Sequence, residues 1–126
     1  MQIIKLDHVN LRTSRLDTMI DWYTKVLGLR RGDRPDFGFD GAWMYAGDTA
    51  VVHLVSVDGE PGAGSEGKLR LEHFALAASG RVEFEARLEA MGERYRRAEI
   101  SDFNLVQINI WDPDGNHIHV DFPADE

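Results

Sequence analysis

The stretch Leu6-Asp7-His8-Val9-Asn10-Leu11 occurs a second time in the chain, in altered form, as Leu71-Glu72-His73-Phe74-Ala75-Leu76. In both copies an acid precedes a histidine and large apolar residues follow at the same places, at an offset of 65 residues (from 6 to 71). A second pair, Val51-Val52-His53-Leu54 and His117-Ile118-His119-Val120, lies near the end of each half at an offset of 66 (from 53 to 119). Repetition at one offset is typical of a chain that contains two copies of one structural module.

This repeat sets the predicted domain organisation. The modules cover about residues 1–60 and 68–124 and belong to one domain, 1–126. Residues 58–67 are rich in glycine and lack large apolar side chains, so they are predicted to form the linker between the modules.

Each half contains one stretch with the apolar spacing of a helix. The first helix is predicted over 16–27, with Ser14 as its N-cap and Gly28 just past its end. The second is predicted over 81–91 and is ended by Gly92. The expected buried faces are Leu16, Ile20, Tyr23 and Leu27 on the first helix, and Val82, Phe84, Leu88 and Met91 on the second.

The remaining apolar runs, rich in valine, isoleucine, leucine and aromatic residues, are predicted to be strands. Each module then has one strand, one helix and about three further strands. The predicted strands are 3–11, 42–46, 50–57, 69–77, 105–111 and 117–122, and a further short strand is expected within 30–40 and within 94–103.

Alternation along these strands predicts where the histidines point, because residues two apart share a face. His8, His53, His73 and His119 each lie opposite a row of apolar residues. A single strand histidine is usually a hydrogen-bonded structural residue. Here four of the five histidines form two repeat-related pairs, and imidazole is the commonest protein ligand for transition metals, so the pattern favours a shared metal site.

Composition excludes several classes of protein. The chain has 126 residues, the size of one domain, and no cysteine, which excludes disulfide scaffolds, iron–sulfur sites and cysteine nucleophiles. Its net charge is −8, so we expect neither nucleic acid nor an anionic membrane as a partner. No apolar run approaches the ~18 residues of a membrane span, and the N-terminal residues lack the pattern of a signal peptide. We expect a cytoplasmic protein with a small-molecule substrate.

The residues resemble the vicinal oxygen chelate superfamily, which includes glyoxalase I, bleomycin resistance proteins and extradiol dioxygenases. The resemblance covers essentially the whole chain. It implies an α+β fold in which two repeated βαβββ modules form a curved, barrel-like mixed sheet, and it implies a homodimer. The count of three tryptophans and six phenylalanines in so small a chain agrees with a buried interface. Its best elements are the two repeated hexapeptides, the helix at 19–29 and the turn Asp112-Pro113-Asp114-Gly115-Asn116.

In the metal-dependent members that this chain resembles, the ligands come from the first and last strands of each module. His8 and His73 match two of those ligands. His53 and His119 stand where glyoxalase I-like members carry glutamate, so the carboxylate that serves there as proton-transfer base is absent. The four histidines are predicted to bind one divalent transition metal (Zn, Ni, Mn or Fe). Arg12 matches a basic residue that binds a carboxylate of the thiol cofactor in glyoxalase I-type members.

Other residues are expected around this site. Trp43 and Tyr45 share one strand face, and Gln107, Asn109 and Trp111 share another; they either line a substrate pocket or fill the core. His117 and Asp121 are expected next to the ligands, where a carboxylate would orient an imidazole. Asp7 and Glu72 are expected to point away from the histidines by alternation.

Three functions fit these residues. The first is a metal-dependent isomerase or lyase that chelates a small oxygen-rich substrate and stabilises an enolate-like anion. The second is a ring-cleaving non-haem dioxygenase, although such members normally use two histidines and a glutamate. The third is a metal-free protein that binds a small molecule such as an antibiotic.

Overall fold

The structure of the chain is a computed structural model that describes residues 1–59 and 70–126. The chain divides into two compact units, Met1–Gly62 and Ala63–Glu126. Residues 60–67 of the predicted linker and residue 69 of a predicted strand lie outside the described residues. No helix of the described ranges is long and apolar enough to cross a membrane.

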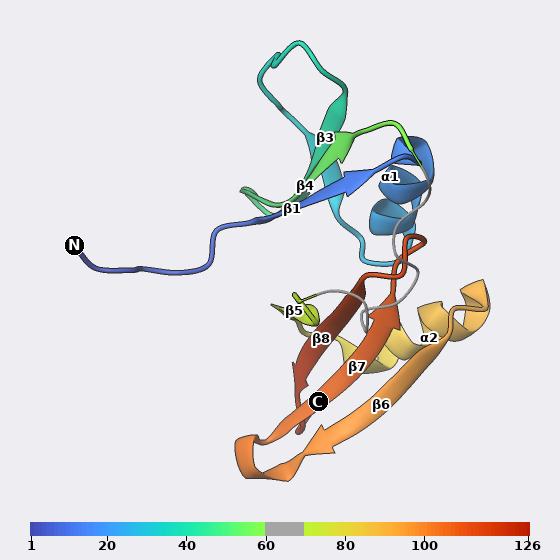
Figure 1. Cartoon of the computed structure of the whole chain (residues 1–126). Coiled ribbons are helices and arrows are strands. Elements are labelled where there is room, and N and C mark those ends of the chain that lie inside the picture. Colours follow the sequence, from blue (N-terminus) through green and yellow to red (C-terminus); the bar gives the residue numbers. More distant parts are fainter. Residues whose placement is uncertain (60–69) are drawn as a thin grey trace. The chain divides into compact units, whose positions relative to one another are not determined.

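The first unit contains one helix and one four-stranded sheet (Figure 1). The sheet has the order β1-β4-β3-β2, in which β1 runs parallel to β4 and the other neighbours are antiparallel. Along the chain the elements are β1 (Val9–Thr13), α1 (Leu16–Lys25), β2 (Arg30–Gly32), β3 (Gly41–Ala46) and β4 (Thr49–Ser56).

The second unit repeats this topology, with sheet order β5-β8-β7-β6 and the same parallel pairing of its first and last strands. The α+β fold of two repeated βαβββ modules is therefore confirmed, including the short strands expected within 30–40 and within 94–103. The elements are β5 (His73–Ala77), α2 (Arg81–Met91), β6 (Tyr95–Ile100), the short 3-10 helix Ser101–Phe103, β7 (Leu105–Trp111) and β8 (His117–Pro123).

The repeat extends to the pairing of individual residues. In the first unit, His53 on β4 lies between Asn10 on β1 and Trp43 on β3. In the second unit, His119 on β8 lies between Ala75 on β5 and Asn109 on β7. His53 and His119, which are 66 residues apart in the sequence, therefore occupy equivalent positions in the two sheets.

Both first strands begin later than predicted. β1 starts at Val9 rather than at residue 3, and β5 starts at His73. The apolar residues Ile3, Ile4 and Leu6 resemble a strand, but a strand needs a neighbour for its backbone hydrogen bonds. Within the described part of the first unit β1 pairs only from Val9 onward, and the three side chains are 74–90% exposed.

Helix α1 is buried through a different face from the one predicted. Met19, Trp22, Tyr23 and Val26 are buried, and only Tyr23 belongs to the predicted stripe. This orientation removes the large surface of Trp22 from water, which favours it. The predicted N-cap Ser14 is wrong. The N-cap position is Arg15, which makes no side-chain cap bond, and its N–H donates to Thr13 Oγ1 at 3.0 Å. The helix also ends two residues earlier than predicted, at Lys25 with Val26 as its C-cap, and Gly28 follows at φ +70°.

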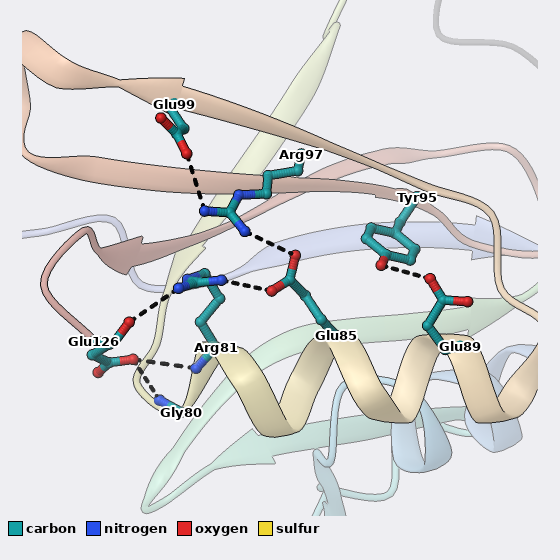
Figure 2. A network of polar contacts seen from close by, with 8 residues as sticks. All are labelled: Gly80, Arg81, Glu85, Glu89, Tyr95, Arg97, Glu99 and Glu126. Carbon is teal, nitrogen blue, oxygen red and sulfur yellow. Dashed lines mark hydrogen bonds and ion pairs between the residues drawn. The ribbon is translucent and has the colours of Figure 1, made fainter.

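Helix α2 has the predicted bounds but a narrower apolar face, because Phe84 and Leu88 are buried whereas Val82 and Met91 are exposed. Polar contacts fasten the helix to β6 and to the end of the chain (Figure 2). Glu85 pairs with Arg81 at 2.6 Å and with Arg97 at 3.8 Å, Tyr95 donates to Glu89 at 2.8 Å, and Glu126 accepts the backbone N–H groups of Gly80 and Arg81.

Candidate metal centre

The first unit stacks two imidazoles and an indole in one column. The ring centroids of His8 and His53 are 3.8 Å apart at an interplanar angle of 11°, and those of His53 and Trp43 are 4.1 Å apart at 12°. His53 is buried, and this burial, followed by the charges of His8 and Arg34, lowers its pKa. A lowered pKa keeps the imidazole neutral and therefore able to bind a metal.

A carboxylate fixes one nitrogen of His8. Nδ1 lies 2.7 Å from Asp7 Oδ2, and this hydrogen bond lowers the pKa of Asp7. A ligating histidine commonly uses its second nitrogen on a carboxylate, so the contact with Asp7 leaves Nε2 as the nitrogen of His8 that is placed to bind a ligand.

An open cavity of about 380 Å³ adjoins this column within the first unit. The predicted residues Trp43 and Tyr45 line it together with both histidines. Arg12 is exposed on β1 and does not line this cavity. The remaining lining residues are Lys5, Asp7, Asp48, Thr49 and Ala50.

The second unit contains an equivalent imidazole pair. His73 and His119 have ring centroids 3.9 Å apart at an interplanar angle of 11°, and His73 Nδ1 lies 2.7 Å from Glu72 Oε2. Burial is the first cause that lowers the pKa of His119, followed by the charges of His73 and His117. Each pair therefore has one histidine held by the acid that precedes it and one partly buried histidine from the last strand.

His117 joins the second pair from the same strand as His119. Ligand atoms of His73, His117 and His119 all lie within 4.8 Å of one another. His117 is buried, with Nδ1 3.0 Å from Glu72 Oε1 and Nε2 2.9 Å from Asn109 Oδ1. The amide nitrogen of Asn109 donates to the Arg96 carbonyl, so its oxygen faces His117. Both partner atoms in these contacts are oxygens, so a ring nitrogen of His117 that carries a proton donates to one of them. His73, His117 and His119 therefore form the candidate metal-binding group of the second unit, and His73 and His119 are its stacked pair.

Trp111 and Asp121 lie around this cluster. The ring of Trp111 stacks on that of His117, with the ring centroids 5.1 Å apart. The guanidinium carbon of Arg94 lies 4.0 Å from the Trp111 ring centroid. Asp121 pairs with Gln107 across the sheet, and burial raises the pKa of its carboxyl. One Asp121 oxygen is buried with no hydrogen-bond partner among the described residues.

Sequence reasoning was wrong about the two acids that precede the histidines. Asp7 and Glu72 were predicted to point away, yet each hydrogen-bonds its neighbouring imidazole, and Glu72 also reaches His117. Alternation fails because β1 begins at Val9 and β5 at His73, so neither acid lies within a strand. The signal was present in the sequence, since an acid precedes the histidine in both copies of the repeat.

The turn before β8 is built on one side chain. Asp112 Oδ1 accepts the backbone N–H groups of Asp114 and Asn116, and Oδ2 accepts the Asn116 amide. Gly115 adopts φ +84°, which favours glycine. The turn fixes the start of β8 and with it the position of His117.

Comparisons with known proteins agree with this fold. The model of the Glyoxalase/Bleomycin resistance protein/Dioxygenase superfamily matches residues 5–120. The chain is 26% identical over 125 residues to Glyoxylase I 4 of Arabidopsis thaliana, covering 95% of this chain and 71% of that protein. A glyoxylase/bleomycin resistance protein/dioxygenase domain from Frankia sp. EAN1pec superposes with a TM-score of 0.80 at 19% identity, covering 97% of this chain and 99% of that one. Lactoylglutathione lyase from Agrobacterium tumefaciens superposes with a TM-score of 0.67 at 15% identity, covering 95% and 94%. The repeated modules and the match over residues 5–120 lead to one conclusion: the chain belongs to the glyoxalase/bleomycin resistance protein/dioxygenase superfamily, also called vicinal oxygen chelate proteins.

Proposed function

We propose that the protein is a metal-dependent enzyme in which His8, His53, His73 and His119 together bind one divalent transition metal. The substrate is a small, oxygen-rich molecule, and the reaction is an isomerisation or lyase step that passes through an enolate-like anion. One observation carries this proposal. Two repeat-related imidazole pairs have the same stacked geometry, at 3.8 and 3.9 Å, and each contains a histidine whose Nδ1 is held by the preceding acid.

The donor set suits such an ion. Carboxylate contacts at Nδ1 leave Nε2 of His8 and His73 available, and the lowered pKa values of His53 and His119 favour the neutral ligand form. A divalent ion held by neutral imidazoles would retain its charge and would act as a Lewis acid on two substrate oxygens. The Trp43 indole provides a flat wall for the substrate beside His53. If only three of the four histidines hold the ion, the fourth would serve as the base.

Metal analysis tests this proposal directly. Protein purified without a histidine tag is expected to contain about one divalent ion for each four-histidine set, and His73→Ala is expected to lose it. His117→Gln is the control, because both His117 nitrogens already have partners and this variant is expected to retain most of the metal. Full occupancy in the His73→Ala variant would contradict the proposal. A panel of α-hydroxythiol adducts and catechols then identifies the reaction, and turnover of a catechol would favour ring cleavage.

A metal-free binding protein is the second candidate. The cavity of about 380 Å³ lies within the first unit and has the aromatic walls Trp43 and Tyr45. This function predicts tight binding of a small molecule by protein that has been stripped of metal, with no gain when metal is returned. Enzyme and binding protein are therefore distinguished by adding the metal back.

A further inference from the structure

Arg34 holds two unpaired hydrogen-bond donors close to the first histidine pair. It lies between β2 and β3, and its guanidinium carbon is 5.0 Å from the ring centroid of Phe37 and 5.2 Å from that of Phe39. Nε and Nη2 are buried and have no hydrogen-bond partner among the described residues. These two nitrogens lie along one edge of the guanidinium, the edge that presents parallel N–H bonds to a carboxylate.

The sheet leaves room for this guanidinium at one glycine. A Cβ added to Gly41 would meet the Leu54 carbonyl oxygen first and would then lie 2.8 Å from Nη2 and 3.0 Å from Cζ of Arg34, so a larger residue would clash with β4 and with the guanidinium. The equivalent position of the second module, 66 residues later, is Gln107. The space for Arg34 is therefore specific to the first module.

Aromatic contacts connect Arg34 to the histidines. Phe37 lies 6.2 Å from Trp43, and Trp43 stacks on His53 at 4.1 Å. The charge of Arg34 also contributes, after burial and His8, to the lowered pKa of His53. Arg34 thus borders the surface on which the proposed substrate would lie.

Two unpaired donors of a buried cation are costly, so an acceptor from outside this segment is expected. The neighbouring acids Asp33, Asp36 and Asp40 do not supply it, because Nε and Nη2 of Arg34 have no hydrogen-bond partner within the described ranges. Phe37 and Phe39 cover the guanidinium but are themselves 48% and 52% exposed, so their side chains are free to rotate and admit a ligand.

We propose that the Nε and Nη2 edge of Arg34 binds the carboxylate of the substrate as a bidentate pair. The substrate class is then a small organic carboxylate with a flat apolar part, which lies against Phe37 and Trp43 while its other oxygens face the histidines. The inference deepens the proposed function and rests on it for the location of the site. It assigns specificity to Arg34 and makes no use of the metal.

Calorimetric titration of metal-stripped protein tests the proposal, with benzoate as the probe and benzamide as its neutral analogue. Wild-type protein is expected to bind benzoate at least about 10-fold more tightly than benzamide, because only the anion makes charge-assisted bonds. Arg34→Gln should remove that preference. Arg34→Lys should restore little of it, because an ammonium group lacks the planar fork. Arg70→Gln, which removes an equal and exposed charge in the second unit, should retain it.

A wild-type readout keeps the test valid if the variants fold poorly. In the ¹⁵N spectrum, addition of benzoate should shift the Nε–H signal of Arg34, and benzamide should not. The proposal would be overturned if the wild-type protein bound the two probes equally or if Arg34→Gln left the benzoate affinity unchanged. It would also be overturned if Arg34→Gln changed only the melting temperature, because the two donors would then bind a carboxylate of the protein itself. Metal content is measured separately on each variant. Absence of carboxylate recognition in protein that binds metal normally would mean that the Arg34 proposal has failed. Carboxylate recognition in protein that binds no metal would mean that the proposed metal site has failed.

Discussion

Glu72 contacts two imidazoles through its two oxygens. Oε2 lies 2.7 Å from His73 Nδ1, and Oε1 lies 3.0 Å from His117 Nδ1. These hydrogen bonds lower the pKa of Glu72, so the carboxylate is ionised and both imidazole nitrogens donate to it. One side chain thereby orients a proposed ligand and its buried neighbour at once. Asp7 does the same for His8 alone, because the first module has Val51 where the second has His117.

Glu72→Gln is expected to weaken metal binding about 10- to 100-fold without abolishing it, because the ligand ring loses its fixed orientation and part of its basicity. Competition with a chromophoric chelator measures the affinity. Glu99→Gln on β6 is the matched control, because it removes the same charge at a pair with Arg97 that does not touch the histidines. An unchanged metal affinity in Glu72→Gln would mean that the carboxylate does not orient the proposed ligand His73.

Gly41→Ala is expected to abolish carboxylate recognition even though Arg34 is still present, because the new methyl group would meet both the Leu54 carbonyl oxygen and the guanidinium, and β3 and Arg34 would have to shift. The benzoate titration measures this loss. Gly47→Ala provides a comparison, since nothing lies within 4 Å of its Cβ position, although its φ of +58° makes that substitution strained as well. Benzoate binding that survives in Gly41→Ala would place the anion elsewhere.

Some of the residues of the candidate sites could be identified from the sequence alone. Repetition pointed to the two stacked histidine pairs, because a repeated histidine is visible in the sequence; that these histidines bind a metal stays a prediction. Arg34 was not predictable in this way, because its partners Phe37, Phe39 and Gly41 form a site only through side-chain packing. Asp7 and Glu72 were misplaced because the strand boundary was misplaced.

The two helices, which are equivalent in the repeat, are held by different forces. Helix α1 buries Met19, Trp22 and Tyr23, whereas α2 buries only Phe84 and Leu88. The second helix compensates with the polar contacts of Figure 2, in which Glu85 joins Arg81 on its own helix to Arg97 on β6. Sequence periodicity predicted the positions of both helices but could not predict this difference, because charge pairs between elements depend on the tertiary arrangement.

Glu85→Ala is expected to lower the free energy of unfolding by about 1–2 kcal/mol, because it leaves the nearly buried Arg81 side chain without its 2.6 Å partner. Urea denaturation measures the change. Glu83→Ala on the same helix is the control and should be close to neutral, because its side chain is 82% exposed and lies 3.5 Å from Arg87. Equal effects of the two substitutions would contradict the role of Glu85.

The contact between Tyr95 and Glu89 makes a pH-dependent prediction. The hydrogen bond raises the pKa of Tyr95 above 10.0, since a phenol donates to the carboxylate only while it is protonated. Its stabilisation is therefore present below pH 10 and is lost as the pH rises through the pKa of the folded protein. Glu89→Gln should bring the Tyr95 titration back toward the ordinary tyrosine range in ultraviolet difference spectra. An unchanged titration would mean that the bond is absent in solution.

At the scale of the whole chain, the internal repeat predicted the topology correctly. Two sheets with the same strand order follow from two copies of one pattern, because pairing in each copy is guided by the same apolar faces. Strand starts were less predictable, since residues 3–8 are as apolar as a strand yet have no neighbour to pair with in the described unit. An apolar sequence indicates that a segment is able to form a strand, but the segment becomes a strand only where a neighbouring strand is present to pair with its backbone.

The exposed Ile3, Ile4 and Leu6 agree with the prediction of a homodimer, because an isolated chain rarely leaves such residues in water. Light scattering at micromolar concentration is expected to give twice the chain mass of 14.3 kDa. Substitution of Ile3 and Leu6 by serine should shift the mass toward the monomer, whereas substitution of the exposed Val82 on α2 should not. A monomeric mass for the unaltered protein would contradict the prediction.

The double hydrogen bonding of His117 supplies a natural spectroscopic reporter. A proton held between a buried ring nitrogen and an oxygen acceptor exchanges slowly with solvent, so an N–H signal of His117 should appear far downfield in a proton spectrum taken in water. Because the ring lies 4.8 Å from His119 and 5.5 Å from His73, this signal would respond to any ion that reaches its neighbours. An unlabelled sample and a one-dimensional spectrum would thus suffice to follow metal loading in the intact protein.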